Sequence, residues 1–264
     1  LAVHYRRTWW LLIFGLAHAY LLWYGDILVM YAVSALWVVL LRKKKPKTLF
    51  ITGMVVFSVA SALYLFTGFT LPFVDEASKQ EILQTWAPGA EALHQEIATY
   101  RGSWTTQMEH RIPGALMMQT FIFFFQTGWR AGGLMLIGMA LFKWGVLSAE
   151  RSRKFYRKMM TWGFVAGLLI VAYGIYTHFE NEFSMEYSFF MGSQINYWGS
   201  ILVSAGYIGL VMLWVKSGIM RSLLKSLRAA GQMALSNYLL QTILCTTLFY
   251  GHGFGLFGKL ERKE

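Results

Sequence analysis

Hydropathy divides the sequence into eight long apolar stretches that contain almost no carboxylate side chains. Most carboxylates lie in two of the gaps between these stretches, whereas the cations cluster in the short gaps. Apolar stretches of this length, without regular two-residue alternation, are typical of transmembrane helices and not of barrel strands. The pattern predicts an all-α fold, a polytopic integral membrane helical bundle in which each helix satisfies its own backbone groups.

One part of this pattern allows two topologies. Polar residues and glycines from Gln126 to Gly133 interrupt the apolar run at 114–147, which could therefore cross the membrane twice or once. A single net crossing keeps the basic run at 151–158 on the same side as the other basic loops, so we choose it. We predict seven crossings, at about 8–24, 27–41, 48–71, 114–147, 161–177, 197–215 and 233–250.

Charge then orients the predicted bundle, because loops rich in Lys and Arg stay in the cytoplasm. We expect 42–47, 148–158 and 216–230 to be cytoplasmic, and 73–112 and 178–194 to be extracytoplasmic. In the 73–112 segment, apolar residues recur at helix spacing on both sides of Pro88-Gly89. This spacing predicts an amphipathic extracytoplasmic cap of two helices lying on the bilayer or on the bundle.

Composition agrees with a membrane location and narrows the range of partners. With 56% hydrophobic residues, the 264-residue chain has too few polar side chains to cover a soluble globule, so the lipid bilayer is its expected surroundings. The net charge of +11 would suggest nucleic acid in a soluble protein, but the topology already explains it and no nucleic-acid partner is expected. The lone Cys245 offers neither a disulfide nor a metal site, and no metal is predicted.

Two ionisable residues near the start of the chain are the candidate catalytic residues. His18 lies about eleven residues into the first span, where a histidine is costly and is therefore a functional candidate. It could act as a general base or carry an acyl group, but it could also be a structural histidine hydrogen-bonded to a neighbouring helix. Asp26 could orient that imidazole, bind a polar acceptor or simply cap the second helix.

Two further sets of polar residues lie within predicted spans. Gln119, Gln126 and Arg130 are spaced by seven and four, which places them on one face of an α-helix and makes them candidates for binding a cofactor. Asn237 and Gln241, four residues apart, are candidates for binding a substrate. Both sets could instead join helices through interhelical hydrogen bonds.

Several short segments resemble a known family. Arg6-Arg7, the segment Gly15–His18, and Trp23–Leu28 with Tyr31-Ala32 resemble the signature of the YeiB-like family of bacterial membrane proteins, catalogued as a domain of unknown function. Segments 136–141 and 231–241 resemble two further blocks, although Gln232 stands where Arg is usual. Members normally carry further spans at both ends. We therefore interpret residues 1–264 as a single transmembrane helical domain that is a portion of a longer protein.

The resemblance also implies a function. The YeiB-like family is remotely similar to the transmembrane acyltransferases, which include heparan-alpha-glucosaminide N-acetyltransferase. The resemblance implies a multi-pass protein of the bacterial cytoplasmic membrane. The implied reaction moves an acyl group from cytoplasmic acyl-CoA to an extracytoplasmic acceptor such as a glycan, in a cavity that contains His18 and Asp26. The alternative from the residues alone is a transporter or lipid-handling protein whose pathway is lined by Gln119, Gln126 and Arg130. A non-catalytic scaffold and a homo-oligomer are left open.

Overall fold

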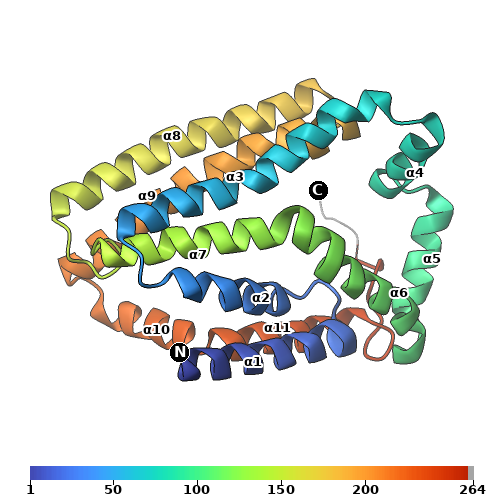
Figure 1. Cartoon of the computed structure of the whole chain (residues 1–264). Helices are drawn as coiled ribbons and strands as arrows, with labels where there is room; N and C mark the ends of the chain where they lie inside the picture. Colours follow the sequence, from blue (N-terminus) through green and yellow to red (C-terminus); the bar gives the residue numbers. More distant parts are fainter. Residues whose placement is uncertain (261–264) are drawn as a thin grey trace. The chain divides into compact units, whose positions relative to one another are not determined.

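The computed structural model describes residues 1–260, and every regular element in that range is a helix (Figure 1). The all-α prediction is therefore confirmed. Three helical segments are long and apolar enough to cross a membrane, namely Pro46–Phe73, Arg153–Glu180 and Glu186–Ser217. Two shorter apolar helices, Leu28–Leu41 and Ala234–Phe249, coincide with two more of the predicted spans. The chain is a membrane protein, and the count of seven crossings stays a prediction.

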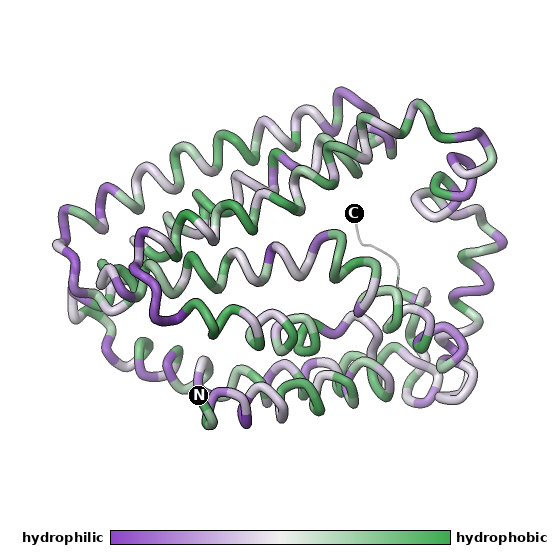
Figure 2. The backbone as a smooth tube through the Cα atoms, viewed as in Figure 1, coloured by the Kyte–Doolittle hydropathy of each residue, from purple (hydrophilic) through white to green (hydrophobic). Residues whose placement is uncertain are grey.

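The surface of the long helices shows why the chain needs lipid around it. Many large apolar side chains along Arg153–Glu180 are more than half exposed, among them Trp162, Leu169 and Tyr173. Figure 2 shows hydrophobic residues over most of this helix and hydrophilic residues near its ends. An apolar surface of this extent would be unfavourable in water, whereas lipid tails accept it.

Residue contacts divide the described chain into two compact units. Unit 1 contains Leu1–Val39, Ala87–Ala131 and the described residues from Ser226 onward, and unit 2 contains Leu40–Trp86 and Gly132–Lys225. The helices α7 (Gly128–Lys143) and α10 (Arg221–Gln232) and the short 3-10 helix η2 (Val39–Leu41) cross from one unit to the other along the chain. The interpretation of the chain as a single domain stays a prediction.

Unit 1 carries the N-terminal hairpin, most of the cap and the last apolar helix. In order, its elements are α1 (Ala2–Ala17), the π-helix η1 (His18–Leu22), α2 (Leu28–Val38), α5 (Ala90–Arg101), α6 (Trp104–Met117), the π-helix η4 (Met118–Thr127) and α11 (Ala234–Phe249).

Unit 2 is built around a pair of long helices. Its elements are α3 (Pro46–Thr70), the 3-10 helix η3 (Leu71–Phe73), α4 (Glu76–Trp86), α8 (Arg153–Glu180), the π-helix η5 (Glu186–Gly192) and α9 (Ser193–Ser217). Helices α8 and α9 approach closely, because Gly163 lies against the backbone of Gly206. Small residues at such contacts are the usual way to bring helices together in lipid. Tyr197 stacks on Phe57 and donates a hydrogen bond of 2.8 Å to its carbonyl, which joins α9 to α3.

Two local expectations are corrected. The 73–112 segment contains a third helix, α6, in addition to the two that Pro88-Gly89 separates. The hydroxyl of Ser103 caps it by accepting the N–H of Thr106 at 3.2 Å. The stretch from Gln126 to Gly133 is not a break but stays helical, with π-type bonding up to Thr127.

Candidate functional site

His18 begins a π-helical turn inside unit 1. Helix α1 ends at Ala17, and the π-helix η1 runs from His18 to Leu22, where the N–H of Trp23 reaches back to the carbonyl of His18 at 2.9 Å. Such i→i+5 turns are rare and frequently lie at functional sites. The His18 side chain is almost fully buried, with 1% of the residue exposed.

Asp26 follows in the short connection before α2. Its Oδ2 accepts the backbone N–H of Val29 at 2.8 Å, so the carboxylate caps the first turn of α2, as the sequence suggested. Only 3% of the residue is exposed. A buried carboxylate needs partners for both oxygens, and the cap satisfies one of them.

The second oxygen of Asp26 faces His18. Its Oδ1 lies 2.9 Å from Nδ1 of the imidazole, and both side chains are buried. Nδ1 makes no hydrogen bond of good geometry, so the contact is a close approach of the imidazole to the carboxylate and not an aligned hydrogen bond. The connection through Gly25 therefore brings together two residues that are eight apart in the sequence.

Gly15 allows the hairpin to close this tightly. A Cβ atom at this position would lie 2.7 Å from the backbone nitrogen of Val29 and 2.9 Å from its side chain. That nitrogen belongs to the same N–H that Asp26 accepts. The absence of a side chain at Gly15 thus sets the separation of α1 and α2 beside the site.

Helix α11 completes the site with two hydroxyl groups. Thr242 Oγ1 lies 3.0 Å from Nε2 of His18, and the hydroxyl of Tyr238 donates to Asp26 Oδ1 at 3.3 Å. The Tyr238 ring also packs against the imidazole, with the ring centroids 4.8 Å apart. We call His18, Asp26, Tyr238 and Thr242 the His18 cluster.

Sequence reasoning chose this helix but missed the residues that contact His18. It selected Asn237 and Gln241, each of which lies one residue before a member of the cluster. Both are exposed, and Asn237 donates to the carbonyl of Ala230 at 3.2 Å. One residue corresponds to about 100° around an α-helix, which accounts for the different face. The repeat Tyr238, Thr242 and Thr246, with four-residue spacing, was the available signal.

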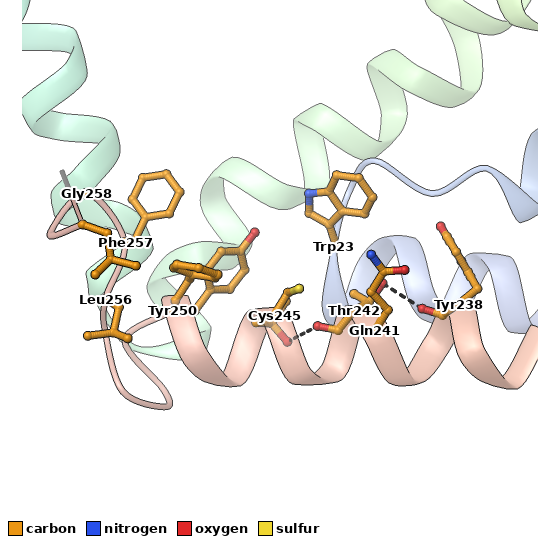
Figure 3. Close-up of a pocket in the computed structure, with 12 residues that line it drawn as sticks. Trp23, Tyr238, Gln241, Thr242, Cys245, Tyr250, Leu256, Phe257 and Gly258 are labelled. Carbon is orange, nitrogen blue, oxygen red and sulfur yellow. Dashed lines mark hydrogen bonds between the residues drawn. The ribbon is translucent and has the colours of Figure 1, made fainter. Parts of the chain in front are cut away.

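A largely apolar cavity of about 530 Å³ adjoins the His18 cluster (Figure 3). It is lined by α11, by Trp23 and by the loop at 256–258. Tyr238 and Thr242 belong to its wall, and Gln241 and Cys245 lie beside them on the same helix. A cavity of this size accommodates a small-molecule group. The predicted substrate role of Gln241 stays a prediction, although the residue lines this cavity.

A buried cation holds the π-turn that starts at His18. Nη1 of Arg111 donates to the carbonyl of Leu21 at 3.0 Å, and its Nη2 donates to Gln107 Oε1 at 2.9 Å. Burial lowers the pKa of the Arg111 guanidinium. In addition, burial and the charge of Arg111 lower the pKa of His252.

The third predicted set does not have the expected geometry. Residues Met118–Thr127 are π-helical, so the wider turns do not keep Gln119 and Gln126 on one face. Gln119 accepts a hydrogen bond of 3.2 Å from Tyr20, and its amide nitrogen is buried without a hydrogen-bond partner. Gln126 and Arg130 are half-buried. The roles proposed for these three residues stay predictions. Among residues 1–260 no group of His, Cys, Asp and Glu side chains could hold a metal ion.

Comparisons with known proteins agree with the family resemblance. Residues 141–264 match the family described as "Protein of unknown function (DUF418)". The chain is 31% identical to "Uncharacterized protein YxaH" of Bacillus subtilis (strain 168), over 98% of this chain and 61% of that protein. It is 29% identical to "Uncharacterized protein YeiB" of Escherichia coli (strain K12), over 96% of this chain and 64% of that protein.

The chain therefore spans about three fifths of the length of these curated relatives. No solved structure matches it. The chain is thus similar to YeiB along nearly its whole length and matches the DUF418 family at residues 141–264, which agrees with the resemblance to the YeiB-like family.

Proposed function

We propose that the protein is a membrane acyltransferase that moves an acyl group from acyl-CoA to an extracytoplasmic acceptor such as a sugar hydroxyl or amine. The observation that carries the proposal is the buried contact of 2.9 Å between His18 and Asp26, beside a cavity of about 530 Å³. A carboxylate on one ring nitrogen orients an imidazole and stabilises the imidazolium that forms when the other nitrogen takes a proton. Acyl transfer to a hydroxyl or amine requires such a base.

The position of each ring nitrogen supports a chemical role for His18. Nδ1 faces the carboxylate, and Nε2 faces a hydroxyl that belongs to the cavity wall. A histidine that only joined helices would not need a charged partner, and burying that partner is costly. This arrangement favours the catalytic reading over the structural reading of His18.

The proposed location is the bacterial cytoplasmic membrane, with the basic loops at 42–47, 148–158 and 216–230 on the cytoplasmic side. Positive charge on that face would attract the phosphates of acyl-CoA. Because the relatives are longer than this chain, the activity is proposed for the full-length protein. The proposal includes a lipid environment and a glycan acceptor, and it requires no metal ion.

The test is acyl transfer by the full-length protein in liposomes, with radiolabelled acetyl-CoA and an extracytoplasmic glycan fraction as the acceptor. We expect His18→Ala to lower transfer by at least about 100-fold, since a positioned acid–base group contributes 10²–10⁴-fold. His4→Ala is the matched control, because His4 lies in α1, which leads directly into η1, and its imidazole contacts the Ala35 carbonyl, the Thr8 hydroxyl and the Tyr5 ring. Absence of both CoA binding and acyl transfer in the wild type, or full transfer by His18→Ala, would overturn the proposal.

A further inference from the structure

We infer that Thr242 is the nucleophile that carries the acyl group between donor and acceptor. The inference rests on the proposed acyltransferase function and adds a covalent O-acyl-threonine intermediate to it. Three observations support it: the partner of the Thr242 hydroxyl, the direction in which that hydroxyl donates, and its place on the cavity wall.

Asp26, His18 and Thr242 form a chain of contacts from acid to imidazole to hydroxyl. The two distances are 2.9 Å, from Asp26 Oδ1 to His18 Nδ1, and 3.0 Å, from His18 Nε2 to Thr242 Oγ1. An adjacent base whose other nitrogen is oriented by a third group is the arrangement that activates a hydroxyl nucleophile. The order of the residues in the sequence is immaterial, because such triads are recognised by geometry.

The neighbours of the imidazole assign its tautomer. A carboxylate only accepts hydrogen bonds, and Asp26 already receives the Tyr238 hydroxyl and the Val29 N–H. The proton of a neutral His18 is therefore placed on Nδ1, beside the carboxylate. Nε2 then carries the lone pair, and the Thr242 hydroxyl donates to it. The alternative acceptor for this hydroxyl, the carbonyl of Tyr238, is more distant at 3.3 Å.

Thr242 also lies where a substrate could reach it. It belongs to the wall of the 530 Å³ cavity, whereas His18 does not line that cavity (Figure 3). Within the described cavity wall, Tyr238 contacts the imidazole through its ring, and Thr242 is the member whose hydroxyl lies within hydrogen-bond distance of His18 Nε2. The side-chain amide of Gln241 stands beside it and could donate a hydrogen bond to a carbonyl oxygen that gains negative charge. His18 thus reaches the cavity through the Thr242 hydroxyl.

The first half-reaction forms the intermediate. Thr242 Oγ1 attacks the thioester carbonyl carbon of acyl-CoA while its proton passes to His18 Nε2. The new C–O bond remains and the C–S bond breaks. His18 then gives its proton to the departing sulfur, so that free CoA leaves and the imidazole is neutral again.

The second half-reaction returns the enzyme to its initial state. The acceptor hydroxyl or amine gives its proton to His18 Nε2 and attacks the acyl carbonyl carbon. The bond from this carbon to Thr242 Oγ1 breaks, and His18 returns the proton to that oxygen. These two half-reactions require only acyl-CoA and the acceptor, and they predict ping-pong kinetics.

The experiment incubates the full-length protein with radiolabelled acetyl-CoA without acceptor, then locates the label by peptide mass spectrometry. Turnover with acceptor is measured in parallel. We expect label on Thr242, retention of both label and turnover in Thr242→Ser, and loss of both by at least about 100-fold in Thr242→Val. Thr67→Val is the matched control, because the Thr67 hydroxyl also bonds the backbone four residues back, at 2.9 Å, but Thr67 lies in α3 and does not line the cavity.

The outcomes separate this inference from the proposed function. Turnover without a covalent adduct, label on Cys245 or His18, or full turnover by Thr242→Val would overturn the role of Thr242 and leave the acyltransferase proposal standing. Absence of turnover and of label in the wild type would overturn both. If Thr242→Val does not fold, as judged by its thermal unfolding, the labelled residue in the wild type and the activity of Thr242→Ser decide the question.

Discussion

Replacing Asp26 with Asn tests the chemistry of the His18 cluster with the smallest change in shape. The amide oxygen can still accept the Val29 N–H, and Asn caps helices about as well as Asp, so the first turn of α2 should be preserved. What is lost is the negative charge 2.9 Å from His18 Nδ1. The amide nitrogen would instead present a donor toward that ring nitrogen or toward Tyr238.

The magnitude follows from these contacts. An imperfectly paired polar group in a buried site costs about 1–3 kcal/mol, which is the expected loss of unfolding free energy. The effect on turnover should be much larger. A donor facing Nδ1 favours the tautomer with the proton on Nε2, which cannot act as the base, and the same change in a Ser-His-Asp triad lowers kcat by about 10⁴. We expect a folded protein with a loss of turnover of about 10³–10⁴-fold.

The assay combines acetyl transfer by the full-length protein, thermal unfolding in detergent and ¹⁵N NMR of labelled histidine to report the tautomer. Asp75→Asn is the control, because Asp75 is also a capping carboxylate, bonded to the N–H of Ser78 at 2.9 Å, but is not in unit 1. A folded Asp26→Asn protein with turnover within threefold of the wild type would refute the catalytic reading of the pair.

Three further predictions concern the rest of the chain. Gly206→Val should lower the unfolding free energy by about 1–3 kcal/mol, because a Cβ at this position would lie 2.8 Å from the ring of Phe164. Gly138→Ala should leave the unfolding free energy unchanged, because nothing lies within 4 Å of a Cβ there, and equal unfolding free energies for the two variants would contradict this prediction. The NMR titration midpoint of His252 should lie below about 6.5, since burial and then the charge of Arg111 lower its pKa in the folded state. The contribution of neutral His252 to stability is therefore present above pH 6.5 and lost as the pH falls through the folded-state pKa. A midpoint at or above 6.5 would be inconsistent with this prediction. A cysteine placed at Arg153 should not react with an impermeant maleimide outside intact cells, and reaction would reject the predicted topology.

Much of the fold could be predicted because lipid imposes a simple pattern on the sequence. The predicted span at 48–71 corresponds to α3, and the span at 233–250 corresponds closely to α11. The ends were less accurate: α8 begins at Arg153, about eight residues before the predicted span, because long basic side chains can continue a helix into the interface. The third helix of the 73–112 segment was missed, and it continues to Met117 with Pro113 inside it.

The site was predicted only in part, for reasons of geometry. A histidine inside an apolar span and an aspartate at a turn are conspicuous, so His18 and Asp26 could be selected from the sequence. Hydropathy cannot show which face of α11 meets them, so Tyr238 and Thr242 were missed by one residue. The prediction that Gln119 and Gln126 share one helix face assumed α-helical turns, and the residue spacing does not indicate a π-helix.

Gly15 has a consequence for how mutational data on this family would be interpreted. It would touch neither donor nor acceptor, yet a side chain there would displace the amide that positions Asp26, and with it the carboxylate beside His18. A scan that scores only activity would therefore group Gly15 with the reacting residues. Larger side chains at this position should reduce activity in proportion to their size, whereas substitutions of a reacting group should abolish it at once. This graded response distinguishes a residue that sets a distance from one that takes part in the reaction.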